Sequence, residues 1–277
     1  MKKNLSTVIL ILVFLTGLSL LLYPSVSDYW NSFHQSKAIA TYASDVAAMD
    51  DQTYEKLWED AQAYNKRLLR REEPLRQTEK RMDEYERLLN VDATGVMGYI
   101  EIPELKVSLP IYHGVDEGVL QIAVGHIPGS SLPVGGKGTH CVLSGHRGLP
   151  SAKLFTDLDE LREGDRFLLR VLDETLTYEV DQILIVEPQE VDDIAIDPEQ
   201  DYCTLVTCTP YGINTHRLLV RGHRVENQAD AQAIRVTADA MQIEPVIVAP
   251  IVAAPMLLGL MLWVLLRNPK KKRKNTH

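Results

Sequence analysis

The sequence predicts a mainly β protein: a small closed or nearly closed β-barrel, with an α-helical stem before it and membrane spans at both ends of the chain. Three observations support this prediction. Uncharged apolar runs lie near both termini, a charged and glycine-poor stretch follows the first run, and short runs of Val, Ile, Leu and Tyr begin at Gly95. Gly, Pro, Asn and Asp interrupt these short runs, which is the pattern of an antiparallel β domain.

The first apolar run, residues 5–22, follows two lysines and predicts an N-terminal membrane anchor or signal segment at residues 1–23. At about 1.5 Å per helical residue, the run can cross most of a ~30 Å hydrocarbon layer. A cleaved signal peptide is the alternative, because Ser25-Val26-Ser27 is a passable cleavage site. The run is longer than the usual ~7 to 15 apolar residues of such a peptide, which favours an uncleaved anchor.

The second apolar run predicts a transmembrane segment at residues 245–267, with a linker at residues 227–244 before it and a basic tail at residues 268–277 after it. A cluster of Lys and Arg directly after a span marks the cytoplasmic side of the membrane. Because basic residues flank both spans, we expect residues 24–244 to lie outside the cytoplasm.

Residues 24–94 are expected to form the helical stem, because apolar residues recur at helical spacing along most of this stretch. Glu72-Glu73-Pro74 should interrupt the stem, since proline disfavours a helix at the residue before it. A solvated spacer that lifts the next domain off the membrane is a sufficient role for such a stem.

Residues 95–226 are expected to form the barrel. Seven or eight short strands fit a small closed unit, and residues 152–161 can supply a short helix between them. The strands are expected near residues 97–102, 107–112, 139–144, 166–172, 175–187, 203–208 and 215–221.

The composition limits the class of partner. The formal net charge is −9, whereas a surface that follows nucleic-acid phosphates needs a basic patch. The basic residues that do cluster lie at the two ends of the chain. Nucleic acid is therefore not expected as a main partner, and the membrane is.

Cys208 is the candidate nucleophile among three cysteines. It ends a strand that Pro210 terminates, so its side chain can project into a cleft. Cys203 points to the opposite face of this strand about 16 Å away, which rules out a disulfide between the two. A cysteine between threonines is more often a small buried apolar residue than a nucleophile. Evidence for a nucleophilic role must therefore come from the residues of the neighbouring strand.

That neighbouring strand begins at Thr215 after a short link, so a hairpin lays its start beside the end of the first strand. Arg217 then falls close to Cys208, while His216 faces the opposite side. A guanidinium in this place can favour the thiolate and hydrogen-bond an oxyanion on an attacked carbonyl. On spacing alone, a surface ion pair is an equally good interpretation of Arg217.

A nucleophilic thiol also needs a proton acceptor. His146 has the best local setting, because flanking glycines let the loop after an expected strand turn sharply and present the ring. His126 lies in a similar glycine-proline loop and is the alternative, and either ring could instead simply bond a loop carbonyl. Spacing alone does not choose among His113, His126, His140, His146, His216 and His223.

Several ordered motifs between residues 95 and 225 resemble those of the sortase family, in its class C, pilin-polymerising branch. A C-terminal span with a basic tail fits the same branch. The motifs are Tyr99-Ile100-Glu101-Ile102-Pro103, Leu109-Pro110-Ile111-Tyr112-His113-Gly114, Ser131-Leu132-Pro133-Val134-Gly135-Gly136, Ser144-Gly145-His146-Arg147-Gly148, Thr204-Leu205-Val206-Thr207-Cys208 and Thr209-Pro210-Tyr211-Gly212-Ile213-Asn214-Thr215-His216-Arg217.

The resemblance implies an eight-stranded barrel in which Cys208 is the nucleophile, His146 the acid and base, and Arg217 the stabiliser of the substrate carbonyl. It implies cleavage of a Leu-Pro-x-Thr-Gly-like sorting signal between Thr and Gly, a thioacyl enzyme, and transfer of the acyl group to an amine. In class C that amine is a lysine of another pilin. Thr207 and Asn214 are the expected substrate-binding residues, and no metal or organic cofactor is expected.

One motif departs from the class C pattern. Many class C enzymes carry an Asp-Pro-aromatic lid between the stem and the barrel, whereas this chain has Glu73-Pro74-Leu75 there. The missing aspartate and aromatic ring predict an open active site. Two other functions are compatible with the sequence: a cysteine peptidase that hydrolyses the thioacyl intermediate, and a non-catalytic membrane scaffold built on the stem.

Overall fold

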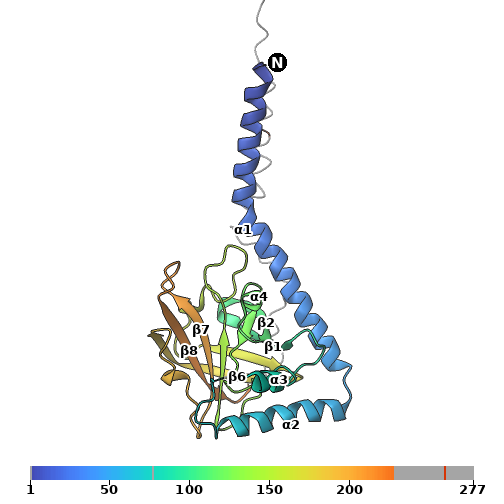
Figure 1. Cartoon of the computed structure of the whole chain (residues 1–277), viewed down its shortest axis with the longest axis vertical. Coiled ribbons are helices and arrows are strands. Elements are labelled where there is room, and N and C mark those ends of the chain that lie inside the picture. Colours follow the sequence, from blue (N-terminus) through green and yellow to red (C-terminus); the bar gives the residue numbers. More distant parts are fainter. Residues whose placement is uncertain (1, 77, 228–258, 260–277) are drawn as a thin grey trace, which may run out of the picture. The chain divides into compact units, whose positions relative to one another are not determined.

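The computed structural model describes residues 2–76, 78–227 and 259 (Figure 1). The chain divides into two compact units, one of which comprises residues 27–240. The expected linker, C-terminal transmembrane segment and basic tail lie outside the described residues, apart from residues 227 and 259.

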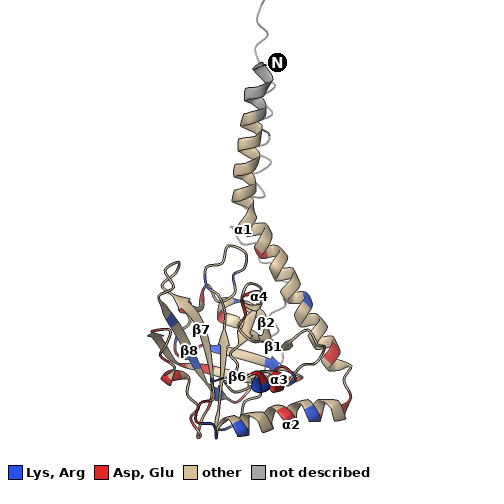
Figure 2. Cartoon of the chain, in the orientation of Figure 1, with Lys and Arg blue, Asp and Glu red and all other residues tan. Residues whose placement is uncertain are grey.

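Three helices precede the barrel: α1 (Lys2–Ala47), α2 (Asp51–Leu68) and α3 (Glu79–Tyr85). The first part of α1 is long and apolar enough to cross a membrane, and it carries no charged residue between residues 9 and 27 (Figure 2). α2 begins after Asp50, whose Oδ1 accepts a hydrogen bond from the backbone N–H of Thr53 at 2.9 Å. This is a typical N-cap, which satisfies one of the free donors at the start of a helix.

The stem is part of the hydrophobic core, so the expected role as a solvated spacer is wrong. Ala61, Tyr64 and Leu68 recur at helical spacing on one face of α2, and all three are at most 1% exposed. Tyr85 of α3 is also fully buried, and these side chains belong to the same apolar cluster as the barrel interior. The predicted break between the helices is present, since residues 69–76 and 78 lie outside α2 and α3.

The eight strands form a closed barrel in the order β1-β2-β3-β4-β7-β8-β6-β5, which confirms the predicted fold class. Each predicted strand corresponds to one in the structure. The strands are β1 (Val96–Ile102), β2 (Val107–His113), β3 (Val124–His126), β4 (Thr139–Ser144), β5 (Arg166–Val171), β6 (Glu174–Val186), β7 (Asp201–Thr209) and β8 (His216–Val225).

The barrel differs from a purely antiparallel sheet at two places, where β2 pairs with β3 and β4 pairs with β7 in parallel. Parallel neighbours need a crossover connection, and the short helix α4 (Glu117–Leu120) lies in the connection between β2 and β3. With three residues, β3 is too short to be recognised as a run of its own. The helix expected at residues 152–161 is reduced to the 3₁₀ turn η2 (Leu158–Glu160).

The remaining short elements are the 3₁₀ turns η1 (Pro103–Leu105) and η3 (Asp192–Ile194). Two contacts orient the barrel relative to its helices (Figure 1). A Cβ on Gly138, just before β4 begins, would lie 3.0 Å from Leu69 at the end of α2, whereas Glu117 of α4 lies 3.7 Å from His146, just after β4 ends. α2 and α4 therefore reach opposite ends of β4.

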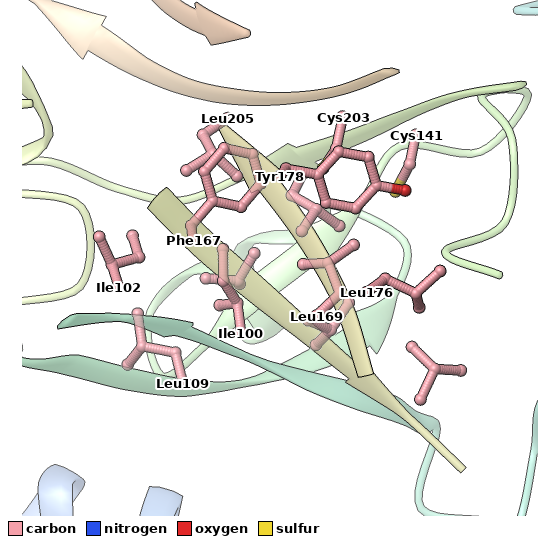
Figure 3. Packing of buried hydrophobic residues seen from close by; sticks show 14 of the residues in the cluster. Ile100, Ile102, Leu109, Cys141, Phe167, Leu169, Leu176, Tyr178, Cys203 and Leu205 are labelled. Carbon is pink, nitrogen blue, oxygen red and sulfur yellow. The ribbon is translucent and has the colours of Figure 1, made fainter. Parts of the chain in front are cut away.

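Side chains alternate between the interior of the barrel and its outer face. The interior is packed with large apolar residues such as Phe167, Tyr178 and Leu205, and Cys141 and Cys203 also point into it from β4 and β7 (Figure 3). A second, smaller apolar cluster lies on the outer face of the neighbouring strands β4, β7, β8 and β6. It consists of Val142, Val186, Val206 and Leu219.

Candidate active site

β7 lies between β4 and β8 and carries Cys208 near its C-terminal end. In the antiparallel ladder with β8, Cys208 is the partner of Arg217, and Thr209 is the partner of His216. Because paired residues share one face of a sheet, Cys208 and Arg217 point to the same side, as the hairpin argument predicted. Cys208 is partly exposed, whereas the other two cysteines are buried. β7 continues one residue beyond Cys208, further than expected.

His146 reaches the other flank of Cys208 through the parallel pairing of β4 with β7. Ser144 is the partner of Val206 in this ladder, so two residues further along each strand His146 is level with Cys208. The pairing continues past the end of β4, because the backbone N–H of Gly145 donates to the Val206 carbonyl at 3.0 Å. The structure thus brings His146 and Arg217 to opposite sides of the same cysteine.

Thr207 fixes this arrangement from inside the barrel. Its side chain is 1% exposed, and its hydroxyl donates a buried hydrogen bond of 2.8 Å to the Gly145 carbonyl. This bond ties the residue before Cys208 to the residue before His146. Thr207 is an expected substrate-binding residue, and in the structure its hydroxyl is directed to the loop that carries His146.

The loop that carries His146 depends on its two glycines. A Cβ on Gly145 would lie 2.7 Å from the ring of Phe155, and a Cβ on Gly148 would lie 2.8 Å from the ring of Tyr211. Gly148 also has a φ of +75°, which side chains disfavour. The His146 carbonyl accepts a hydrogen bond from the Phe155 N–H at 3.1 Å. This bond and the close packing against both glycines fix the backbone of the loop.

The guanidinium of Arg217 is held by its own turn and not by an acid. Its Nη1 donates to the carbonyl of Asn214 at 3.3 Å and to that of His216 at 3.1 Å. Within the described part of the chain, no carboxylate lies within 4 Å of it. The ion pair that was the alternative interpretation is therefore missing there, and the positive charge remains available next to Cys208. Asn214 contacts Arg217 through its backbone carbonyl. Its own backbone is in the left-handed region, with a φ of 60°.

Glu117 was not anticipated from the sequence. Its Oε2 lies 3.7 Å from Nε2 of His146, and its side chain is 71% exposed. The carboxylate therefore lies within ion-pair distance of the candidate base. No sequence signal identifies it, because Glu117 lies 29 residues before His146 and reaches it only through the crossover between the parallel strands β2 and β3.

His126, the alternative candidate base, has both ring nitrogens occupied in the core. Nδ1 lies 3.0 Å from the hydroxyl of Tyr85, and Nε2 lies 2.8 Å from the carbonyl of Ser131. The ring is 0% exposed. His126 is thus a buried histidine with satisfied hydrogen bonds, and His146 is the ring that shares an edge of the barrel with Cys208.

An apolar cluster continues from Cys208 along the outer face of the sheet. Val206 lies two residues before Cys208 on β7, and Leu219 lies two residues after Arg217 on β8, so both share the face of the candidate catalytic residues. Ile194, from the connection between β6 and β7, packs against this cluster. Val206 and Leu219 are only 8% and 5% exposed, so this cluster forms a small buried core next to the thiol.

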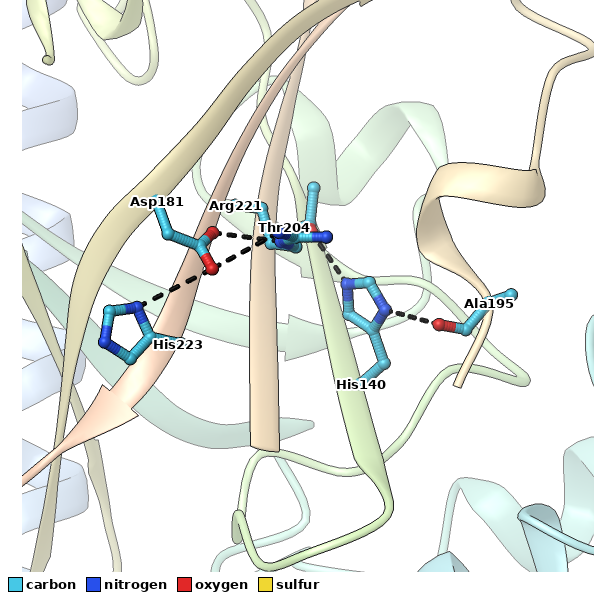
Figure 4. Close-up of polar contacts among 6 residues, drawn as sticks. All are labelled: His140, Asp181, Ala195, Thr204, Arg221 and His223. Carbon is cyan, nitrogen blue, oxygen red and sulfur yellow. Dashed lines mark hydrogen bonds and ion pairs between the residues drawn. The ribbon is translucent and has the colours of Figure 1, made fainter. Parts of the chain in front are cut away.

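His140 holds the connection between β6 and β7 in place (Figure 4). Its Nδ1 lies 2.8 Å from the Ala195 carbonyl and its Nε2 lies 2.7 Å from Oγ1 of Thr204. A carbonyl can only accept, so Nδ1 carries the proton and Nε2 accepts from the threonine hydroxyl. Burial lowers the pKa of His140, in agreement with a neutral ring. Beside it, Arg221 forms a bidentate pair with Asp181 at 2.9 and 3.2 Å.

The lid-equivalent residues Glu73, Pro74 and Leu75 lie in the turn between α2 and α3. Glu73 is exposed, and its Oε2 pairs with Nη1 of Arg76 at 3.0 Å within the same turn. Its carboxylate is therefore directed to a neighbour in the sequence. Among the described residues, no group of three or more His, Cys, Asp or Glu side chains is placed to hold a metal ion.

Comparison with known proteins agrees with this geometry. The sortase domain family matches residues 100–225. Sortase D of Bacillus subtilis is 33% identical over 131 residues, which cover 46% of this chain and 63% of that protein, so the match spans somewhat less than two thirds of the relative.

Two solved structures are similar over most of the described chain. Sortase C1 of Streptococcus agalactiae is 50% identical with a TM-score of 0.67, and the match covers 69% of this chain and 100% of that one. Sortase C of Streptococcus pneumoniae, whose structure was studied for catalysis and pilin substrate specificity, is 43% identical with a TM-score of 0.61, over 70% of this chain and 98% of that one. The chain belongs to the sortase family, in its class C branch.

Proposed function

We propose that this protein is a membrane-anchored cysteine transpeptidase that cleaves a Leu-Pro-x-Thr-Gly-like sorting signal and joins the acyl fragment to an amine. The observation that supports it best is the convergence of three residues on one edge of the barrel. Cys208 on β7 has Arg217 as its ladder partner on β8, and the parallel register of β4 brings His146 level with it on the other side.

In the acylation half of the reaction, the Cys208 thiolate attacks the carbonyl carbon of the Thr–Gly bond. The developing oxyanion is stabilised by the Arg217 guanidinium, whose charge no carboxylate neutralises among the described residues. Protonated His146 transfers its proton to the nitrogen of the departing glycine. The C–N bond breaks, and a thioester between Cys208 and the threonine carbonyl remains.

In the second half, an amine attacks this thioester. Neutral His146 accepts a proton from the attacking nitrogen, the C–S bond breaks, and Cys208 leaves as a thiolate. The product is an amide. We propose a lysine side chain of another pilin as the amine, on the basis of the likeness to sortase C enzymes. The proposed substrates are surface proteins or pilins with sorting signals, and no step needs a metal or an organic cofactor.

The proposed setting is the cell membrane, with the catalytic domain outside the cytoplasm. The uncharged stretch of α1 between residues 9 and 27 supports the N-terminal anchor. The cytoplasmic C-terminal tail rests on the sequence alone, on the Lys and Arg cluster after residue 267.

The test is to incubate the protein with a sorting-signal peptide, with and without a lysine-containing acceptor, and to identify the products by mass spectrometry. A transpeptidase gives an acceptor adduct in place of the free acid when the amine is added. Free acid in both reactions would instead identify a peptidase. No cleavage in either reaction, together with unchanged surface assembly in a Cys208→Ala strain, would favour a scaffold.

A further inference from the structure

Two cysteines that the proposed chemistry does not use lie side by side inside the barrel. Cys141 on β4 and Cys203 on β7 are direct partners in the parallel ladder of these strands. Both side chains point into the interior, next to Tyr178 (Figure 3), and they are 2% and 0% exposed. Their thiols are joined by a hydrogen bond. The two sulfur atoms are therefore already in contact in the folded barrel.

This placement is compatible with a disulfide. Neighbouring strands of a sheet lie about 4.8 Å apart, and ladder partners such as Cys141 and Cys203 are separated across this spacing. A disulfide joins residues whose Cα atoms are about 4.4 to 6.8 Å apart. The bond can therefore form without a change in the register of β4 and β7.

Cys208 cannot replace either of these cysteines in such a bond. It shares the outer face of the sheet with Arg217, its partner on β8, whereas Cys141 points into the interior. Cys203 lies five residues before Cys208 on the same strand, which is too far for a disulfide between the two. The fold thus allows one pairing among the three cysteines and leaves Cys208 unpaired.

The proposed location of the barrel makes this pairing important. Outside the cytoplasm, protein thiols are exposed to oxidising conditions, and a chain with three cysteines keeps an odd thiol. An exported enzyme whose nucleophile is a thiol has to keep that thiol out of disulfides. Pairing the other two cysteines with each other removes both as intramolecular partners of the nucleophile.

We propose that Cys141 and Cys203 form a structural disulfide in the exported chain, which leaves Cys208 as the single thiol. This inference rests on the extracytoplasmic location given under the proposed function. Cys141 lies five residues before His146, and Cys203 lies five residues before Cys208. The bond therefore fastens together the two strands whose register places the candidate base level with the nucleophile.

The oxidant that we propose is the disulfide of an exported thiol–disulfide oxidoreductase. Because both sulfurs are buried in the closed barrel, the exchange takes place while the chain folds. The Cys141 thiolate attacks the oxidoreductase disulfide, forms a mixed disulfide and releases one cysteine thiolate of the oxidoreductase. The Cys203 thiolate then attacks the sulfur of Cys141 and releases the second. Two thiols of this chain are oxidised to one disulfide, and one disulfide of the oxidoreductase is reduced to two thiols.

Counting thiols in the full chain tests the proposal. The chain is exported in a bacterial host that has such an oxidoreductase and in a matched strain that lacks it. Cells are quenched in acid, and the protein is denatured in N-ethylmaleimide so that burial does not protect any thiol. Intact-protein mass spectrometry should show one adduct from the first host and three from the second. Three adducts from the first host would overturn the disulfide, and one adduct from both hosts would overturn the proposed oxidant.

Single variants from the first host identify the pair. Cys208→Ala should give no adduct, because both remaining sulfurs are bonded to each other. Cys141→Ala and Cys203→Ala should each give two adducts, because each leaves two cysteines that the fold keeps apart. Fewer than two adducts in either of these variants would show a different pairing and would contradict the proposal.

Thermal unfolding measures what the bond does for the fold. The bond closes a loop over residues 142–202, so reduction of the parent in detergent micelles should lower its Tm by about 5–10 °C. The Cys141→Ala, Cys203→Ala double variant is the matched control, and its Tm should not respond to the reductant. Equal responses of both proteins would contradict a structural disulfide.

The same samples separate this proposal from the proposed function when they are incubated with a sorting-signal peptide. Three adducts in a chain from the first host that cleaves the peptide would overturn the disulfide and leave the proposed function standing. One adduct in a chain that cleaves no peptide would support the disulfide and count against the proposed function.

Discussion

At the scale of single residues, the proposed chemistry depends on three side chains, which come from β7, from β8 and from the loop after β4. Cys208→Ala should abolish the covalent acyl-enzyme, because it removes the only partly exposed thiol. Cys141→Ala and Cys203→Ala remove buried thiols that face the barrel interior and should retain it. Intact-protein mass spectrometry after incubation with a sorting-signal peptide measures the adduct. An adduct on the Cys208→Ala protein would contradict the assignment.

Arg217 gives a second prediction at this scale. Its planar guanidinium can donate to the oxyanion while Nη1 remains bonded to the carbonyls of Asn214 and His216, and a lysine ammonium lacks this forked geometry. Arg217→Lys should therefore lower kcat by about 10² to 10³, the usual effect of losing one oxyanion donor. Steady-state kinetics on the peptide measures it. If the lysine variant has a kcat close to that of the parent, Arg217 does not stabilise the oxyanion and has only a structural role in the hairpin.

At the scale of elements, the connection between β6 and β7 is held by a neutral His140, so its stability should depend on pH. Burial holds the pKa of His140 below its usual value near ~6.5. The unfolded chain then binds the proton more readily, so this stabilisation is complete above about pH 6.5 and is lost as the pH falls through the lowered value. Acidification should therefore lower the Tm of the parent.

His140→Asn is the matched control, because asparagine places an amide donor near the position of Nδ1 but does not titrate. Between about pH 7.5 and pH 5.5, the Tm of the parent should fall by a few °C more than that of the variant, since about 1 kcal/mol corresponds to ~2–4 °C at this size. Circular dichroism of the full chain in detergent micelles measures both. Parallel curves for the two proteins would show that His140 does not titrate in this range.

The turn between α2 and α3 carries the prediction of an open site. Glu73 pairs with Arg76 in its own turn, so removing Glu73 and Leu75 should leave access to Cys208 unchanged. We expect a small thiol reagent to modify Cys208 at nearly equal rates in the parent and in a Glu73→Ala, Leu75→Ala double variant. A tenfold acceleration in the variant would reveal about 1.4 kcal/mol of lid closure.

At the scale of the whole molecule, the helical stem and the barrel share one core and should unfold together. Leu68 is 0% exposed in the barrel's own apolar cluster, whereas the next residue, Leu69, is 38% exposed. Leu68→Ala should cost about 2–5 kcal/mol through lost burial and a residual cavity, and Leu69→Ala should cost much less. Thermal unfolding followed by tyrosine fluorescence measures both. Separate transitions for stem and barrel would contradict a shared core.

The sequence by itself determined the parts of this molecule that depend on near neighbours in the chain. Alternating apolar runs defined seven of the eight strands, because a strand's period is a local property. The proximity of Cys208 and Arg217 also followed from the sequence, since a short link between two strands leaves a hairpin as the simple arrangement. The choice of His146 over His126 came from a family resemblance, because spacing left both open.

The tertiary structure decided what depends on distant segments. The parallel register of β4 and β7 brings His146 level with Cys208, and the crossover through α4 adds Glu117 beside it. The side chain of Thr207 points into the barrel, and residues of α2 belong to the hydrophobic core. No local pattern encodes these contacts, because strands joined by long connections can pair in either direction, and only closing the barrel around one shared core selects the partner and the register.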